Sequence, residues 1–541
     1  MSLDIDLGVS LLFSGYPAAG GGAAEPNNDT HFSFTDFYVQ PTGSNLNAGS
    51  TSSDAALATY VNSAVLGWNS GTGVFEVASG DPVADGVTVG MFGSVYVTAG
   101  ATVATFVARV TAVSTTAVTV SLTAVSGTPP TTDTAGARTL KIGGAWAGPG
   151  GSVGFPYNFV YGSMMDSSNN IPHVNLKGGV DYSVTASVRR CYGSAWAAAN
   201  AYVIGDVIVS SGTVYRCILG HTNQVPPNAT YWVVVSLTIS PVVFRGYTTT
   251  PRDNGQARIK GPTTGASFIV VSDLGSYTLH ADIDVQDNGA TGSASGFALS
   301  GSTNMAFGVS AHGMRGRGVE LNNVLGALVE CEAWGCNTSN TTYSGGIHAA
   351  TAGSFVFRCM SHNNRGGSNG HGITMDTSIY WKECISAYNS GDGYQSNADT
   401  NVTLSSCDFY NNGANGLNFT GGSTTMLLSI VNCNFVKNGA NGILFRRYGE
   451  IGEFAGNRFG AGTMANTTAD ATTFEPFSMS AANNSSYASD VTPWSDPDNG
   501  NLSITLAAAV GAGYGTYTAA FNGFGTNVSY PDVGAAEKSH A

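Results

Sequence analysis

Five charged residues lie directly beside a recurring cysteine in this 541-residue sequence: Glu330, Glu332, Arg358, Glu383 and Asp408. Enzymes that hydrolyse glycosidic bonds use two carboxylates, about 5–5.5 Å apart for retention or about 6.5–9.5 Å for inversion. Glu330, Arg358 and Glu383 each precede a cysteine, at steps of 28 and 25 residues. If these steps are successive turns of a stacked structure, Glu330 and Glu383 lie about 9–10 Å apart with Arg358 between them. This spacing suits an acid–base pair, but a surface ladder of ion pairs would use the same residues.

Glu332 and Asp408 follow cysteines and lie three steps apart, about 14 Å in a stacked structure, which is too far to share one bond. Four histidines occur in the same region, at 312, 348, 362 and 371, without the spacing of metal ligands. We expect them in turns or on the surface. The sequence therefore predicts no metal site and no cofactor, and its sparse carboxylates favour binding over cleavage.

The elements that position these residues are repeats of about 24 residues. The first repeated column is Ile283, Val309, Cys331, Cys359, Cys384, Cys407 and Cys433. A second column is a Gly-apolar step: Gly296-Phe297, Gly318-Val319, Gly346-Ile347, Gly372-Ile373, Gly393-Tyr394, Gly416-Leu417 and Gly442-Ile443. A third is an asparagine: Asn288, Asn364, Asn389, Asn412 and Asn438. Short alternating apolar runs cut by Asn and Gly predict strands and turns, not helices. We interpret each repeat as one coil of a β-solenoid, with inert buried thiols and a ladder of asparagines.

Coils of the form C-x-F-x-x-N-G-x-N-G-I-x-F, as in Cys433–Phe445, resemble right-handed parallel β-helix proteins such as pectate lyases and phage tailspikes. The resemblance covers roughly residues 240–475. In addition, Phe37–Ala56 is similar to the first-coil signature of such proteins, and Tyr530–Glu537 to a closing motif. The resemblance implies an all-β, right-handed parallel β-helix with two small inserted β modules and a C-terminal cap. It does not fix an activity, because this fold hosts lyases, hydrolases, adhesins and inert spikes.

Composition shifts divide the chain into seven parts. We expect an N-terminal arm or attachment segment at 1–35, the start of the β-helix at 36–69, an inserted barrel-like module at 70–128, coils at 129–190, a second module at 191–235, the main β-helix at 236–475, and a cap or oligomerisation region at 476–541.

The second module carries the pattern W-x5-Y-x2-G-D-x-V…Y-x-C…P…W. This pattern resembles the small chitin- and cellulose-binding modules of carbohydrate-binding families five and twelve. The resemblance implies that some of Trp196, Tyr202, Tyr215 and Trp232 stack on sugar rings. So small a module also needs aromatic rings in its core, and we expect two of the four there. Cys191 and Cys217 could pair as a disulfide.

The chain is poor in charge, with 10 % charged residues, and acidic, with a net charge of −14 and a pI of about 4.9. This balance disfavours nucleic acid and anionic membranes as partners, but not glycans. No run of about 18 apolar residues exists, so we expect no membrane span. The sequence MSLDIDLGVSLLF has acidic residues where a signal peptide needs basic ones, so we expect no export signal.

These observations favour a structural spike or fibre on a phage virion surface that binds cell-surface polysaccharide. The N-terminal segment would join it to other virion proteins, and the resemblance implies a homotrimer. A polysaccharide depolymerase or lyase of the same fold is the alternative, and a bacterial surface adhesin is a second one.

Overall fold

A computed structural model describes residues 33–44, 49, 52–53, 55–63, 66–69, 72–97, 106–124, 132–133, 135–146, 170–184, 187–190, 192–202, 206–234, 242–251, 253, 255–261, 269–286, 295–301, 303–322, 326–339, 345–396, 401–419, 427–445, 450–461, 465–466, 469–473, 479–482, 485–486, 494–496 and 501–504. Predictions for Cys191, Asn288, the first 32 residues and Tyr530–Glu537 lie outside these residues. The described residues form strands β1 to β49 and one short 3-10 helix, η1 (Gly367–Asn369). No helix among them is long and apolar enough to span a membrane.

The chain divides into two compact units, of which the first comprises residues 1–146, 160–179 and 237–256. In this unit β1 (Ser33–Val39), β10 (Asn170–Lys177) and β19 (Val242–Tyr247) pair in parallel, in that order. Between β1 and β10 the chain forms an antiparallel sheet in the order β2-β9-β5-β6-β7-β4-β3-β8. Its strands are β2 (Ala58–Val61), β3 (Leu66–Asn69), β4 (Thr72–Glu76), β5 (Phe92–Val97), β6 (Phe106–Val113), β7 (Ala117–Ala124), β8 (Thr132–Asp133) and β9 (Arg138–Ile142).

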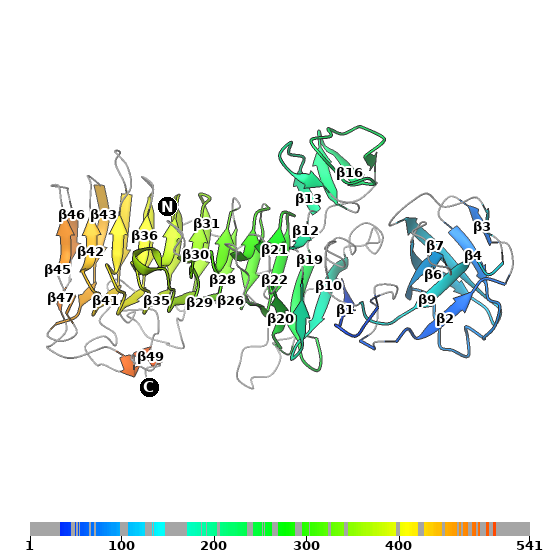
Figure 1. Cartoon of the computed structure of the whole chain (residues 1–541), viewed down its shortest axis with the longest axis horizontal. Helices are drawn as coiled ribbons and strands as arrows, with labels where there is room; N and C mark the ends of the chain where they lie inside the picture. The colour runs from blue at the N-terminus through cyan, green and yellow to red at the C-terminus, as the bar shows by residue number, and fades with distance from the viewer. Residues whose placement is uncertain are drawn as a thin grey trace. The chain divides into compact units, whose positions relative to one another are not determined.

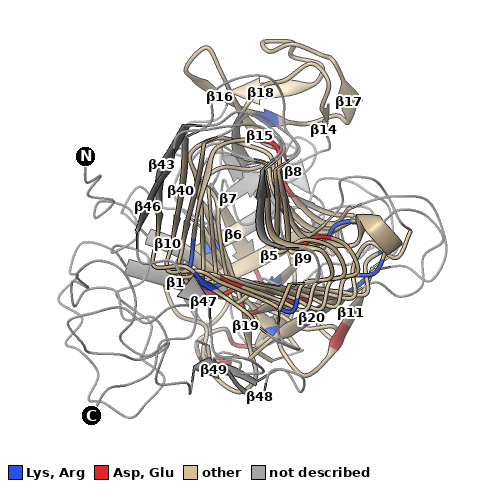
Figure 2. Ribbon diagram, turned by 90° about the vertical axis from the view of Figure 1, so that its left-hand side faces the viewer, with Lys and Arg blue, Asp and Glu red and all other residues tan. Residues whose placement is uncertain are grey.

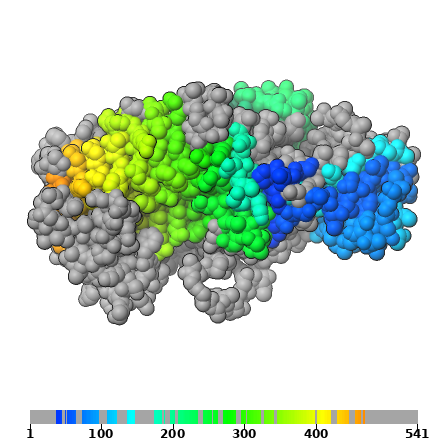
Figure 3. Space-filling model, turned by 60° about the horizontal axis from the view of Figure 1, so that its bottom comes forward, coloured from blue at the N-terminus to red at the C-terminus, as the bar shows by residue number. Residues whose placement is uncertain are grey.

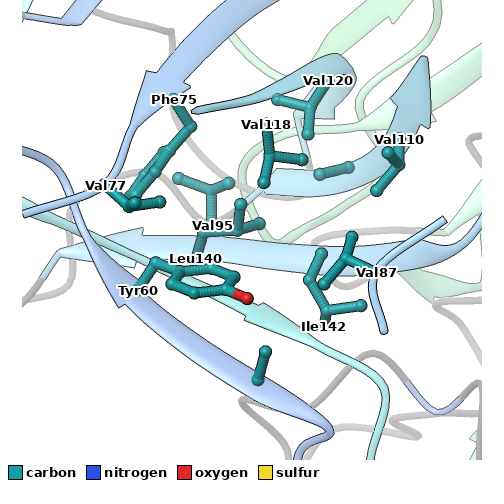
Figure 4. Packing of buried hydrophobic residues seen from close by; sticks show 12 residues of the cluster. Tyr60, Phe75, Val77, Val87, Val95, Val110, Val118, Val120, Leu140 and Ile142 are labelled. Atoms are coloured by element: carbon teal, nitrogen blue, oxygen red, sulfur yellow. The ribbon is translucent and has the colours of Figure 1, made fainter. Parts of the chain in front are cut away.

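This antiparallel module is longer than the range 70–128 that the sequence suggests. Its first strand β2 pairs with its last strand β9, Tyr60 opposite Leu140, so the module runs from Ala58 to Ile142. Tyr60, Leu140 and Ile142 are buried in the same core as Phe75 and the alternating valines of β5, β6 and β7 (Figure 4). The sequence predicts coil strands at 36–69 and 139–148, because apolar and polar residues alternate in the same way along parallel and antiparallel strands.

The second unit comprises residues 147–159, 180–236 and 257–541, and it contains the stacked coils (Figure 1). Each coil contributes one strand to each of three parallel sheets, which confirms the predicted right-handed parallel β-helix. The first sheet contains β22 (Thr278–Ala281), β25 (Met305–Phe307), β28 (Ala327–Val329), β31 (Ser354–Phe357), β34 (Ile379–Lys382), β37 (Val402–Ser405), β40 (Leu427–Val431), β43 (Glu450–Ala455) and β46 (Met479–Ala482).

The second sheet contains β11 (Asp181–Ser183), β20 (Ala257–Lys260), β23 (Ile283–Gln286), β26 (Ser310–His312), β29 (Glu332–Trp334), β32 (Met360–His362), β35 (Ile385–Ala387), β38 (Asp408–Tyr410), β41 (Asn434–Val436), β44 (Arg458–Phe459) and β47 (Ser485–Ser486). The third sheet contains β12 (Val188–Arg190), β21 (Ile269–Asp273), β24 (Ser295–Leu299), β27 (Val319–Leu321), β30 (Gly345–Ala349), β33 (His371–Met375), β36 (Tyr394–Ser396), β39 (Leu417–Phe419), β42 (Asn441–Phe445) and β45 (Ala469–Thr473). Looking along the stack, Figure 2 shows how few of these strand positions carry a charge.

The repeated columns of the sequence are columns of the structure. In the third sheet the apolar residues of the Gly-apolar steps pair in register from Phe297 through Ile443. The glycines allow neighbouring coils to approach closely, since a Cβ on Gly416 would lie 2.5 Å from the Gly442 carbonyl oxygen. The five cysteines of the first column are all buried. In the space-filling view, the colours of successive coils follow their order in the chain (Figure 3).

Two tight corners shape each coil. Between the first and second sheets the corner residue has a left-handed backbone, with φ between 52 and 57° at Asp282, Glu330, Arg358, Glu383, Ser406 and Asn432. Between the second and third sheets lies the asparagine ladder. Asn364 Nδ2 donates to Asn389 Oδ1 at 2.7 Å, Asn389 Nδ2 to Asn412 Oδ1 at 2.9 Å, and Asn412 Nδ2 to Asn438 Oδ1 at 3.0 Å. The ladder continues to Asn466, which is not in the asparagine column found in the sequence.

The second inserted module comprises β13 (Tyr192–Ala195), β14 (Ala201–Tyr202), β15 (Val207–Ser210), β16 (Thr213–Cys217), β17 (His221–Thr222) and β18 (Trp232–Val234). All six strands lie within the interruption seen at 191–235. The coils continue past residue 475, because β46 and β47 still pair with β43 and β44. A hairpin of β48 (Trp494–Asp496) and β49 (Asn501–Ile504) follows.

Candidate functional site

The corner between the first and second sheets carries the predicted ladder of Glu330, Arg358 and Glu383. Arg358 Nη1 lies 3.4 Å from Glu330 Oε1, and its Nε lies 3.1 Å from Glu383 Oε2. Lys382 Nζ lies 3.3 Å from the other oxygen of Glu383, whose side chain is 1 % exposed. Because Arg358 bridges both acids and Glu383 is buried, this arrangement fits an ion-pair ladder better than an acid–base pair.

Glu332 and Asp408 lie on the outer face of the second sheet, three strands apart, as the register of β29, β32, β35 and β38 shows. Asp408 is fully buried, and Asn434 Nδ2 donates to its Oδ1 at 2.8 Å. The Glu332 side chain is 43 % exposed. Of the five predicted residues, Glu332 is therefore the carboxylate best placed to meet a ligand away from the corner ladder.

Three aromatic side chains form a stack beside Glu332. His312, Trp334 and His362 occupy one register position on β26, β29 and β32. The ring centroids of His312 and Trp334 are 4.4 Å apart with 5° between their planes, and those of Trp334 and His362 are 6.0 Å apart with 9°. All three are only partly buried, so one edge of the stack faces solvent. The imidazoles hold the indole in one orientation.

A carboxylate accompanies each imidazole. On one side, Asp284 lies with its oxygens 3.2 Å from His312 Nε2, 2.7 Å from Arg258 Nε and 2.7 Å from Ser310 Oγ. Burial by itself raises the pKa of Asp284, but hydrogen bonds from His312, Arg258 and Ser310 outweigh it and hold the pKa below its usual value. Asp284 is therefore a fixed negative charge with an exposed cation, Arg258, beside it.

On the other side, His362 Nε2 lies 2.7 Å from Glu332 Oε1. Asn363 Nδ2 lies 2.9 Å from His362 Nδ1 and can donate to it, which leaves the proton of the neutral imidazole on Nε2. Among the described residues only Oε1 of Glu332 takes part in such a contact. The second oxygen can accept a hydrogen bond from a ligand, and a carboxylate paired with an imidazole is also suited to proton transfer.

We call Asp284, His312, Glu332, Trp334 and His362 the imidazole–carboxylate face. Sequence analysis singled out Glu332 but left the histidines as turn or surface residues and did not use Trp334. The signal was present in the spacing, because His312, Trp334 and His362 each stand three residues after the cysteine column. Among the described residues, no group of three or more His, Cys, Asp and Glu side chains is placed to hold a metal ion.

The other two histidines differ from expectation, because His348 and His371 are buried. His348 Nδ1 lies 2.9 Å from Thr374 Oγ1, and His371 Nδ1 lies 3.5 Å from Asp392 Oδ2. Burial lowers the pKa of His371, partly offset by Asp392. His348 shares the outer side of the third sheet with Thr374, its register partner on the next strand.

The aromatic residues of the second inserted module are mostly core. Tyr202, Tyr215 and Trp232 are buried, three of the predicted four instead of two, and Trp196 packs against them partly exposed. The indole N–H groups of Trp196 and Trp232 both donate to the Gln224 carbonyl oxygen, at 3.2 and 2.7 Å. A buried ring offers no face to a sugar, so stacking by this module now depends on Trp196. The Cys217 thiol lies 3.2 Å from the Leu219 carbonyl oxygen.

No protein-family model matches the sequence, and a search of curated proteins found no match. Among solved structures, the chain is similar to the A-module of mannuronan C-5 epimerase AlgE4 from Azotobacter vinelandii, with 14% identity, a TM-score of 0.39, and coverage of 59% of this chain and 80% of that one. It is also similar to pectate lyase Pel9A, with 12% identity, a TM-score of 0.35, and coverage of 68% and 88%. A catalytic domain of GH87 α-1,3-glucanase matches with 9% identity, a TM-score of 0.21, and coverage of 78% and 92%. We draw no functional conclusion from likenesses at this level.

Proposed function

We propose that this protein binds a polysaccharide along the exposed outer face of the second sheet. The observation that carries the proposal is the His312–Trp334–His362 stack with a carboxylate at each imidazole. Sugar hydroxyls both donate and accept hydrogen bonds, and this face offers acceptors at Glu332 and donors at Arg258. The strands, about 4.8 Å apart, place the three rings in one row across three coils, which suits a linear chain.

The charge of the molecule agrees with a glycan ligand. A net charge of −14 disfavours nucleic acid. Beside the imidazole–carboxylate face, however, Arg258 pairs with Asp284, so a neutral glycan is not repelled there. The described residues of the inserted module add Trp196 as a second contact for sugar.

The test is retention of the purified protein on immobilised surface polysaccharide of a candidate host. Trp334→Ala should weaken retention about tenfold or more, a loss of about 1.4 kcal/mol. Tyr380→Ala is the matched control, because Tyr380 is an exposed aromatic residue, 54 % exposed, on the first sheet. Equal retention of wild type and Trp334→Ala, with both variants folded by circular dichroism, would overturn the proposal.

Cleavage is a second candidate, favoured by the 2.7 Å contact between the exposed Glu332 and His362. Size-exclusion chromatography of the glycan from the same sample distinguishes the two. If the protein cleaves, the glycan shortens with time, and Glu332→Gln stops the shortening while retention persists. If it only binds, chain length stays constant for wild type and variant alike.

For the place of action, we propose a spike or fibre on a phage virion that assembles as a homotrimer. The composition, rich in Gly and poor in charge, supports this proposal. Sedimentation equilibrium should give about three times the chain mass of 55.4 kDa. Mass spectrometry of purified particles tests the location, and an exclusively cell-surface pool would favour the adhesin instead.

A further inference from the structure

Two arginines flank the imidazole–carboxylate face, at the corner between the second and third sheets. Arg315 stands three residues after His312, and Arg365 stands three residues after His362, so the pattern H-x-x-R occurs twice. The coil between these two carries the indole of the ring stack, and there Asn337 holds the arginine position. Because parallel coils align residues one repeat apart, the two arginine positions lie two coil spacings apart, about 9–10 Å along the stack.

Neither guanidinium has a carboxylate partner among the described residues. The arginines that do pair in these coils each lie 3.4 Å or less from a carboxylate oxygen: Arg258, Arg317 and Arg358. Arg365 is exposed and Arg315 is partly exposed, so solvent reaches both side chains. The Nε group of Arg315 is nevertheless buried without a hydrogen-bond partner. The two arginines therefore present donors that the described part of the protein leaves unused.

This corner is basic although the molecule as a whole is acidic. The turns that form it in four successive coils are 313–318, 335–339, 363–370 and 388–392. Together they contain three arginines and a single acid, Asp392. Asp392 is 3 % exposed, and asparagine amides donate to its two oxygens at 2.7 and 2.8 Å. Acidic residues elsewhere in the chain act from further away, and physiological salt screens exposed charges beyond about 8–10 Å. The local charge at this corner therefore favours an anionic group.

We propose that Arg315 and Arg365 bind the negative groups of an acidic polysaccharide that lies across the imidazole–carboxylate face. A guanidinium can donate two parallel hydrogen bonds to one carboxylate, and the oxygens of a sulfate can accept in the same way. Two cationic positions about 9–10 Å apart suit a chain that carries a charge on more than one sugar. Nucleic acid is disfavoured, because two unpaired arginines neutralise few phosphates on a protein of net charge −14.

This inference rests on the proposed function, because it assigns a charge to the glycan that the same face binds. The probes are hexaoses of β-1,4-glucose, of 6-O-sulfated β-1,4-glucose and of β-1,4-mannuronate, each titrated calorimetrically into the full chain. At least one acidic hexaose should bind about tenfold tighter than the neutral one, and the pair of acidic probes distinguishes sulfate from carboxylate. Arg315→Gln/Arg365→Gln should bring the acidic hexaoses to the affinity of the neutral hexaose.

Lys437→Gln is the matched control for Arg365→Gln. It removes one positive charge from the same corner three coils further along the stack, after β41, and the preference for the acidic hexaose should persist. Equal losses in Lys437→Gln and Arg365→Gln would contradict the proposal, because they would indicate attraction to overall charge only. The melting temperatures of the variants should match that of wild type, since neither mutated arginine has a partner among the described residues.

Three further results would overturn the inference: no hexaose binds, the neutral hexaose binds as tightly as both acidic ones, or the arginine double variant keeps the preference. Trp334→Ala separates this inference from the proposed function. If the neutral hexaose binds wild type but not Trp334→Ala, the ring stack binds glycan even where no acidic preference exists. If Trp334→Ala instead keeps the full affinity for the acidic hexaose, the arginines bind it without the stack.

Discussion

Single residues decide how closely the coils approach one another. The glycine of each Gly-apolar step faces the next coil across a gap that admits no side chain, as Gly393 and Gly416 show with Cβ-to-oxygen distances of 2.7 and 2.5 Å. The oxygens belong to backbone in a parallel ladder, so they cannot move without breaking strand pairing.

Gly416→Ala should therefore destabilise the protein by about 1–3 kcal/mol, the range for overpacking a dense interior. Urea unfolding followed by circular dichroism measures the change. Gly220→Ala is the matched control, because its nearest neighbour, the Tyr202 carbonyl oxygen, would be 3.6 Å away. Equal stability of wild type and Gly416→Ala would show that the coils can separate at little cost.

The asparagine ladder makes a second prediction for a single residue. Asn389 Oδ1 accepts from Asn364 Nδ2 at 2.7 Å, and its Nδ2 donates to Asn412 Oδ1 at 2.9 Å. Asn389→Leu removes one hydrogen bond from the buried amide of each neighbour and the Oδ1 acceptor of the Asn364 backbone N–H, and it should cost about 2–4 kcal/mol. The measurement is again the urea midpoint, with Asn369→Ala outside the ladder as the control. A loss no greater than that of the control would mean that the ladder contributes shape and little stability.

At the scale of the elements, strands of the second sheet surround one titratable carboxylate, Asp284. Asp284 on β23 is held ionised by Arg258 on β20 and by Ser310 and His312 on β26, with Asp181 on β11 3.9 Å from Arg258. The pKa of Asp284 is lower when folded than when unfolded. Its contribution to stability is therefore fully present above about pH 4, the unfolded pKa, and is lost as pH falls through the lower folded pKa.

Comparing wild type with Asp284→Asn from pH 7 to pH 2.5 isolates this contribution. The difference in unfolding free energy should be constant above about pH 5 and shrink as the solution becomes more acidic than about pH 4. A difference that stays level through the acidic range would mean that Asp284 keeps the same pKa in both states. The control is Ser405→Ala on the first sheet, whose effect should not change with pH.

The elements also show what sequence can and cannot predict here. The register of Phe297 through Ile443 and the row from Asp284 to Asn434 were both predictable, because parallel coils align residues one repeat apart. The spacing also aligns His312, Trp334 and His362, but only the structure shows that their rings stack across three coils.

Across the whole molecule, the boundaries of the inserted modules illustrate a second limit. Residues 58–142 alternate apolar and polar residues much as coil strands do, and only the pairing of β2 with β9 assigns both ends to the antiparallel module. The compact 191–235 module was easier to place, because its dense aromatic residues interrupt a region rich in Gly, Ser and Thr. Repeats constrain architecture strongly, whereas an insertion is recognised only where its composition departs from theirs.

The stack of coils as a whole makes a last prediction through its cysteines. Cys331, Cys359, Cys384, Cys407 and Cys433 stand one per coil in the interior, and burial raises the pKa of Cys359, Cys407 and Cys433 well above the usual value. A thiol buried inside a coil cannot meet iodoacetamide whatever its protonation state, so each can be labelled only when its own coil opens. Each coil contacts mainly its neighbours, so opening should begin at the end of the stack.

Pulse labelling under native conditions, read by peptide mass spectrometry, should therefore modify Cys433 first, because the last strands of the stack, β46 and β47, follow it closely in the chain. Cys407 and Cys384 should follow, and Cys359 should be slower than Cys433 by about tenfold or more, which corresponds to about 1.4 kcal/mol between the two openings. Cys359→Ser is the control for coupling between coils, and in this variant Cys433 should be labelled at the same rate as in wild type. One common rate for all the column thiols would contradict end fraying and show instead that the stack opens as one cooperative unit.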